Sequence, residues 1–285
     1  MSDQFAFKRQ MRARKRQQQF RRKMFFLVCS LIIITVLAFA VKGIWTNFSN
    51  RSHNNEEFIF NGYVYPEAPQ KSADILVDAV SSDDVRIAYL TFDDGPNNSV
   101  TPEVLDVLRR YDVRATFFLV GSLIEKNPDM ARRIYEEGHL LANHSYNHNY
   151  SELYADSDSF MNQANSTHEL IQKITCDAYY PKVFRFPGGG YNAGSYGEAK
   201  QQYKLLLEEK EFRYCDWNSL TGDAETSSPT ADYIMERLKA STKNKEDCVV
   251  LMHDALAKSV TAKTLPYVIE YLLNQGYIFD TLDNA

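Results

Sequence analysis

Acidic and histidine side chains that could share a metal ion occur at two points of the 285-residue sequence. Asp93 and Asp94 are adjacent, so their side chains diverge, and one can face a metal while the other faces a water molecule. His144 and His148 have the i, i+4 spacing that lets two imidazoles reach one ion from a helical turn. Together with Asp94 they would leave coordination positions open for water and substrate. Each pair alone has another interpretation. Asp-Asp-Gly-Pro also forms turns, and buried or surface histidines commonly have roles other than metal binding.

Three further features would complete a hydrolytic site. A metal lowers the pKa of its bound water and polarises a carbonyl oxygen, so Asp93, which is not needed as a ligand, could act as the general base on that water. His253 could protonate a leaving nitrogen, and Arg185 could orient Asp93. The glycines after Pro187 could bring backbone N–H groups close to a developing oxyanion. Together these parts could hydrolyse an amide.

From residue 85 onward, apolar strand-like runs alternate with amphipathic helical stretches. This alternation predicts an α/β fold with a mainly parallel sheet covered by helices. About seven strands in about 200 residues favour a distorted (β/α) barrel over an open sheet. The predicted strands are 85–92, 115–121, 139–145, 182–187, 212–218, 248–253 and 277–282. The predicted helices are one that opens at Thr101-Pro102, with threonine as its cap, and those at 123–137, 157–174, 197–211, 231–242 and 257–274.

The reactive residues follow the ends of the predicted strands. Asp93 and Asp94 end the first strand, His144 ends the third, Arg185 lies near the end of the fourth, and His253 ends the sixth. Because enzymes of this fold class carry their chemistry at the carboxyl ends of the strands, these side chains are expected to meet.

Four motifs in this order are similar to those of the polysaccharide deacetylase family, carbohydrate esterase family 4. They are TFDDGP at 91–96, HSYNH at 144–148, RFPGG at 185–189 and LMH at 251–253. The resemblance covers about residues 85–285. It implies a distorted (β/α) barrel, a zinc-type His-His-Asp site, and removal of acetate from N-acetylglucosamine polymers or, less often, of O-acetyl groups from xylan.

The resemblance also implies a role for each matching residue. Asp93 would be the catalytic base, Arg185 would orient it, and His253 would be the catalytic acid. The metal ligands would be Asp94, His144 and His148, and Leu251 would line the pocket for the acetyl methyl group.

Two motifs depart from the family pattern. Gly188 stands where an aromatic residue often follows the proline, and Tyr191 comes slightly later, so the shape of the sugar subsite is in question. The Gly188 N–H should still supply the oxyanion contact. The acid histidine could be supported by Asp216, which matches by its Asp-Trp letters, or by Asp223, which fits better by spacing and is preferred. Tyrosines near the site could stack on sugar rings or simply pack: Tyr146, Tyr150, Tyr154 and Tyr191.

The N-terminal region predicts a membrane anchor. Residues 1–23 hold nine Lys or Arg and one acidic residue, and residues 24–41 form an uncharged apolar run. The positive-inside rule places the N-terminus in the cytoplasm and the rest outside the cell. A cleaved secretory signal is the alternative, and both export the remainder. The predicted organisation is a basic cytoplasmic arm (1–23), a transmembrane anchor (24–41), an extracellular stem (42–84) and a catalytic domain (85–285).

Charge and cysteine content restrict the classes of ligand and of metal or disulfide site that the protein could have. Beyond residue 23 there are 23 basic against 36 acidic residues, and so acidic a body is a poor binder of nucleic acid. It also disfavours a metal phosphoesterase. Three exported cysteines without a CxxC pair exclude a cysteine zinc site or a disulfide scaffold. Cys215 and Cys248 are expected to be core thiols, with one disulfide between them as the alternative.

The expected function is hydrolysis of N-acetyl groups in a bacterial envelope polysaccharide, with peptidoglycan as the first substrate. The alternative substrate is the amino sugar of a secondary wall polysaccharide or its linkage unit. A non-catalytic sugar-binding module is a distant alternative, because base, ligands and acid are all retained. The expected cofactor is Zn²⁺, or another divalent transition metal such as Co²⁺. The expected partners are the wall polymer and the membrane, and no protein partner is implied.

Overall fold

The computed structural model describes residues 59–60, 63–64, 86–191 and 195–283. The predicted basic arm and transmembrane anchor lie outside the described residues. Among the residues that are described, none of the helices is both long enough and apolar enough to span a bilayer. The chain divides into two units after Tyr65. In the first unit, Ile59–Phe60 (β1) pairs antiparallel with Tyr63–Val64 (β2), within the predicted stem.

The second unit contains a parallel sheet whose central strand is β3, Arg86–Gly95. The strand order is β7-β6-β5-β4-β3-β9-β8, and β10 pairs with the first half of β3. All the ladders of this sheet are parallel. The other strands are β4 (Thr116–Leu119), β5 (Leu140–Asn143), β6 (Val183–Phe184), β7 (Arg213–Tyr214), β8 (Ser219–Leu220), β9 (Asp247–His253) and β10 (Tyr277–Phe279).

The sheet confirms the predicted parallel α/β class but forms a curled half-barrel. In the described part of the chain β7 and β8 are the ends of the sheet, and no ladder joins them. Both are two residues long, and so is β6, because irregular segments carrying site residues replace longer strands there. Strand β8 was not predicted from the sequence.

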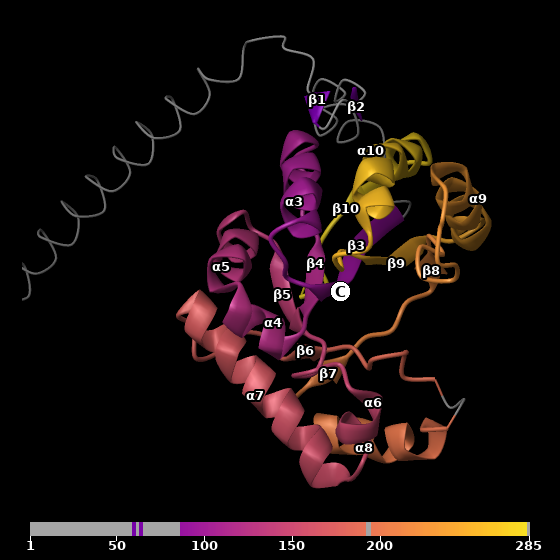
Figure 1. Cartoon of the computed structure of the whole chain (residues 1–285). Helices are drawn as coiled ribbons and strands as arrows, with labels where there is room; N and C mark the ends of the chain where they lie inside the picture. The colour runs from indigo at the N-terminus through magenta and orange to yellow at the C-terminus, as the bar shows by residue number, and fades with distance from the viewer. Residues whose placement is uncertain (1–58, 61–62, 65–85, 192–194, 284–285) are drawn as a thin grey trace, which may run out of the picture. The chain divides into compact units, whose positions relative to one another are not determined.

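The helices lie around the outside of the curled sheet (Figure 1). They are α3 (Val100–Arg110), α4 (Gly121–Lys126), α5 (Pro128–Glu136), α6 (Tyr150–Leu153), α7 (Ser157–Thr175), α8 (Gly197–Glu209), α9 (Ala231–Thr242) and α10 (Ser259–Asn274). The single helix predicted over 123–137 is wrong, because Pro128 starts a new helix and Asn127 before it leaves the helical conformation. The predicted Thr101 cap is also wrong. The Asn97 carboxamide oxygen accepts from the backbone N–H groups of Ser99 and Val100 instead.

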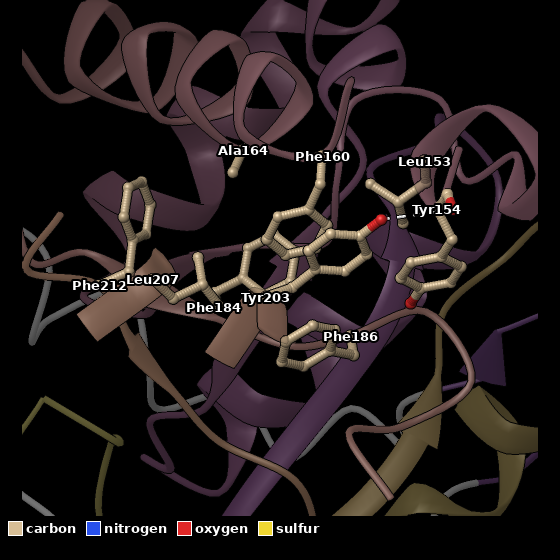
Figure 2. Close-up of a cluster of buried hydrophobic side chains, with 9 residues drawn as sticks. All are labelled: Leu153, Tyr154, Phe160, Ala164, Phe184, Phe186, Tyr203, Leu207 and Phe212. Carbon is tan, nitrogen blue, oxygen red and sulfur yellow. Dashed lines mark hydrogen bonds between the residues drawn. The ribbon is translucent and has the colours of Figure 1, made fainter. Parts of the chain in front are cut away.

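Two features of the core hold the site in place. Strands β4 and β5 are buried throughout, and so is most of β3, so their carboxyl ends are fixed by packing. A second cluster of nine buried side chains joins α6, α7 and α8 to β6 (Figure 2). At its centre the rings of Phe160 and Tyr203 stack with centroids 4.4 Å apart. Cys248 is buried in the core as expected, whereas Cys215 is half-buried; both carry free thiols, so the alternative of a disulfide between them is wrong.

Candidate active site

The carboxyl ends of four strands, β3, β5, β6 and β9, bring the predicted reactive residues together. Asp93 and Asp94 are near the end of β3, and His253 is the last residue of β9, in register with Asp93. His144 directly follows β5, and Arg185 directly follows β6. Strands β3, β4, β5 and β6 are consecutive neighbours, and β9 lies on the other side of β3. All five residues therefore lie along one edge of the sheet, the one formed by the carboxyl ends of its strands.

Asp94, His144 and His148 form a group that could hold a metal ion. One potential ligand atom from each lies within 4.8 Å of the others. Asp94 Oδ1 is 3.2 Å from His148 Nε2 and 3.5 Å from His144 Nε2. This oxygen is buried and has no hydrogen-bond partner among the described residues, which is costly unless something else binds it. Two imidazoles and an otherwise unpartnered carboxylate oxygen therefore fit a divalent transition metal.

The backbone around these three residues is not regular. Asp94 has φ +74°, Ser145 has φ +66° and His148 has φ +55°. The expectation that the two histidines share a helical turn is wrong, because residues 144–148 form a loop. Left-handed conformations at non-glycine positions cost energy and persist where the surroundings enforce them. Here they turn both imidazoles toward Asp94.

Hydrogen bonds from neighbouring segments hold this loop. The Asn143 carboxamide oxygen accepts from the Ser145 N–H at 3.0 Å, and the Ser145 hydroxyl accepts from the His148 N–H at 3.2 Å. Gln163 Oε1, on α7, accepts from the backbone N–H groups of Tyr146 and Asn147. Asn143 and Gln163 were not predicted as site residues, and only their spacing to the histidine motif could have indicated them.

His144 is prepared as a neutral ligand. Its Nδ1 lies 2.9 Å from the Arg185 carbonyl oxygen, so Nδ1 carries the proton and Nε2 is left with a free lone pair toward Asp94. Burial lowers the pKa of His144 to about 3, and the nearby His148 and Arg185 charges act in the same direction, while the Asp94 carboxylate opposes them. A neutral imidazole is the form that binds a metal.

Arg185 is wholly buried and is fixed at each of its guanidinium nitrogens. Its Nη1 donates to Asp93 Oδ1 at 2.8 Å and to the Thr91 hydroxyl at 2.8 Å, while Nε and Nη2 donate to the Cys215 and Asp216 carbonyl oxygens. Burial raises the pKa of Asp93, and the Arg185 charge opposes that rise. The other carboxylate oxygen, Asp93 Oδ2, lies 3.7 Å from His144 Nε2 and therefore faces the metal group.

His253 is paired with Asp223. Its Nδ1 lies 2.9 Å from Asp223 Oδ1, and its backbone N–H donates to Asp223 Oδ2 at 2.8 Å. Burial would lower the pKa of His253, but the hydrogen bond and charge of Asp223 outweigh it and raise that pKa to about 9. Of the two supporting carboxylates considered from the sequence, Asp216 instead accepts from the Gly190 N–H at 2.7 Å. Asp223 thus leaves His253 Nε2 as the proton-carrying atom that faces the site.

The three predicted substrate residues lie around the same centre. Leu251 is half-buried on β9, in register with Thr91, two residues from His253 and on the same face. The Gly188 N–H donates no hydrogen bond to any described residue and remains available to a ligand. Tyr191 is 49% exposed, and its hydroxyl donates to the Trp217 carbonyl oxygen at 2.9 Å.

Asp254 was not predicted to belong to the site. It is fully buried, its backbone N–H donates to the Asp93 carbonyl oxygen, and its carboxylate accepts from the Thr101 hydroxyl at 2.5 Å. Burial raises the pKa of Asp254 to about 7, against the effect of the Thr101 hydrogen bond. A Cβ at Gly95 would collide with this carboxylate. Asp254 therefore holds the turn after the two reactive aspartates, and the Asp-Asp-Gly-Pro motif is both a turn and part of the site.

Lys200 is a second residue that was not predicted. Its side chain is buried on α8, and Nζ donates to the Gly189 carbonyl oxygen at 2.7 Å and, more weakly, to that of Pro187 at 3.4 Å. With the bond from the Gly190 N–H to Asp216, these contacts fix the loop on either side of Gly188.

A curled parallel sheet with a His-His-Asp group, an arginine-held aspartate and an aspartate-held histidine at its carboxyl edge defines a class of metal-dependent hydrolase. Comparison with known proteins names the family. The polysaccharide deacetylase family profile matches residues 81–204. A peptidoglycan-N-acetylglucosamine deacetylase of Bacillus cereus is 31% identical over 199 residues, which cover 69% of this chain and 86% of that protein.

Two further similar proteins support the same family assignment. Peptidoglycan-N-acetylglucosamine deacetylase PgdA of Listeria monocytogenes is 32% identical over 229 residues, or 80% of this chain and 42% of that longer protein. The crystal structure of the catalytic domain of the Eubacterium rectale peptidoglycan N-acetylglucosamine deacetylase superposes with a TM-score of 0.64. It is 30% identical and covers 69% of this chain and 88% of that one. This chain belongs to the polysaccharide deacetylase family.

Proposed function

We propose that the protein is a membrane-anchored, zinc-dependent enzyme that hydrolyses N-acetyl groups of N-acetylglucosamine residues in peptidoglycan and releases acetate. The observation that carries this proposal is the common placement of three units at one sheet edge. They are the Asp94-His144-His148 group, the Asp93–Arg185 pair and the His253–Asp223 pair. The relatives named for peptidoglycan deacetylation support the substrate.

The metal, held by Asp94, His144 and His148, would polarise the acetyl carbonyl and make water a stronger nucleophile. Zinc is the default metal for a site of two imidazoles and one carboxylate. A metal-binding histidine needs a partner for its other ring nitrogen, and the His144 Nδ1–H donates to the Arg185 carbonyl oxygen.

The chain's own residues then move two protons. Asp93 Oδ1 is held by Arg185, so Asp93 Oδ2 is the oxygen that takes a proton from the attacking water. The water oxygen bonds to the acetyl carbon, and the free Gly188 N–H can donate to the developing oxyanion. His253 Nε2 gives its proton to the sugar nitrogen as the C–N bond breaks, which leaves a free amine and acetic acid, and the acid then ionises to acetate. Asp223 stabilises the His253 imidazolium that donates.

The location is part of the proposal. Nine basic residues before an uncharged apolar stretch at 24–41 support an N-terminal anchor with the catalytic domain outside the cell. An enzyme held there would face the wall polymer.

The amino sugar of a secondary wall polysaccharide, or of its linkage unit, is a second candidate substrate. Gly188 and Tyr191 favour it, because they give the subsite a different shape from the one that the family pattern implies.

An acetate-release assay tests the reaction and separates the two substrates. The purified, zinc-loaded protein would be incubated with purified peptidoglycan, with wall polysaccharide carrying its linkage unit, and with N-acetylglucosamine oligomers. We expect acetate from peptidoglycan and from the oligomers, and none with Asp93→Asn. Acetate from the secondary polymer alone would transfer the proposal to that substrate, and zinc-bound protein that releases none from any of them would refute it.

A further inference from the structure

Tyr150 lies against the site without taking part in the chemistry described so far. It is the first residue of the short helix α6, two residues after His148, and it is 38% exposed. Its ring centroid is 5.5 Å from that of His148.

Gly188 is matched to this tyrosine. The residue has φ +74°, and a Cβ built on it would lie 2.9 Å from the Tyr150 hydroxyl oxygen and 3.3 Å from two ring carbons. The phenol end therefore occupies the space that a side chain at position 188 would need. Glycine is required here twice over, for its left-handed backbone and for the room it leaves.

The surrounding packing fixes the ring but leaves its hydroxyl without a partner. Tyr150 makes edge contacts with the rings of Tyr154, 5.9 Å away, and Tyr196, 6.4 Å away. Tyr154 in turn belongs to the buried cluster in Figure 2, and its hydroxyl donates to the Pro187 carbonyl oxygen at 2.8 Å. The Tyr150 hydroxyl makes no hydrogen bond with any described residue. An anchored ring with a free polar end, half-open to solvent, is the type of group that contacts a ligand.

We propose that Tyr150 is a substrate-binding residue, whose ring forms one wall of the sugar site and whose hydroxyl donates a hydrogen bond to the bound N-acetyl sugar. This inference rests on the proposed function. In this proposal the wall of the sugar site beside Gly188 is formed by Tyr150, which comes from a different segment of the sequence. Tyr150 and Gly188 together then determine which sugar fits.

Binding without turnover tests this. In the Asp93→Asn background the ligands are intact and the base is absent, so the affinity for an N-acetylglucosamine oligomer can be measured by calorimetry on the zinc-loaded protein. Tyr150→Phe keeps the ring and removes only the hydroxyl. We expect it to weaken binding by about 10-fold, the effect of one lost hydrogen bond to a ligand. Tyr150→Ala, which also removes the wall, should weaken it further.

The matched control is Tyr179→Phe, because Tyr179 is 95% exposed on the loop before β6. It should bind as its Asp93→Asn parent does. Equal affinity of Tyr150→Phe and its parent would overturn the inference. So would a loss of bound zinc in Tyr150→Phe, since the residue would then act through His148. If the parent binds no oligomer and the wild-type protein releases no acetate from any wall polymer, the proposed function itself fails. Wild-type turnover together with an unchanged Tyr150→Phe refutes only the role of Tyr150.

Discussion

Replacing Asp223 by asparagine should change how activity depends on pH. Asp223 raises the pKa of His253 from its ordinary 6.5 to about 9 against the effect of burial. This difference corresponds to about 3 kcal/mol of stabilisation of the imidazolium. His253 has to be protonated to donate to the leaving nitrogen, so wild-type activity should fall as pH rises through about 9.

In Asp223→Asn the negative charge is gone, while an amide oxygen can still accept from His253. Without the Asp223 charge, burial holds the His253 pKa at or below its ordinary value, so the protonated fraction falls by at least about 30-fold at about pH 8 and by much less at about pH 6. The loss of activity in the variant, relative to wild type, should therefore grow with pH.

The raised pKa of His253 also makes the stability of the fold depend on pH. A raised histidine pKa stabilises the fold fully below the unfolded value of 6.5, and that contribution is lost as pH rises through about 9.

The assay is kcat/KM for acetate release across pH, with zinc content measured at each point. Asp216→Asn is the matched control, because Asp216 binds the Gly190 N–H rather than His253, and asparagine can still accept that bond. The control should keep its basic limb at the wild-type pH. A basic limb that stays near pH 9 in Asp223→Asn, or that moves equally in Asp216→Asn, would refute the assignment of Asp223 to His253.

Three other substitutions have defined outcomes. Arg185→Met leaves the Asp93 carboxylate buried and unpaired, and urea unfolding should show a loss of about 3–5 kcal/mol; a loss below about 1 kcal/mol would contradict the buried ion pair. His139 is buried and neutral, its Nδ1 accepts from the Ala115 N–H, and burial lowers its pKa to about 4. Stability should thus fall by up to about 3 kcal/mol as pH drops from 6.5 to 4, and His139→Gln should flatten that part of the stability–pH curve. His148→Gln should weaken zinc binding by more than about 100-fold in a chelator competition, because it removes a direct ligand; unchanged affinity would place the metal elsewhere.

Much of the fold could be predicted because its strands are long apolar runs. The parallel strand direction follows from the strand–helix alternation. The rule that catalytic residues lie at the carboxyl ends of the strands correctly predicted that Asp93, His144, Arg185 and His253 meet. The predicted strands 182–187 and 212–218 contain β6 and β7, which are only two residues long, and the two-residue strand β8 carries too little pattern to be located. Their pairing is set by neighbours far away in the sequence, as is the open junction between β7 and β8.

The local geometry of the site could not be predicted for a different reason. The left-handed backbone of Asp94 and His148 is uncommon at any non-glycine position, and surrounding contacts such as the Ser145–His148 hydrogen bond enforce it. The contribution of Asp254 depends on a contact with Thr101, 153 positions away in the sequence. The choice between Asp216 and Asp223 depended on which carboxylate reaches His253, and a distance of 2.9 Å to Asp223 answers it.

Zinc titration of the metal-free protein tests the central claim most directly. Acetate release from peptidoglycan should rise in proportion to added zinc and level off at about one equivalent, as expected for a single three-ligand site. Asp93→Asn should bind the same single equivalent and release no acetate, because its ligands remain and its base is gone. Wild-type activity that does not depend on zinc, or Asp93→Asn activity equal to wild type, would contradict the account.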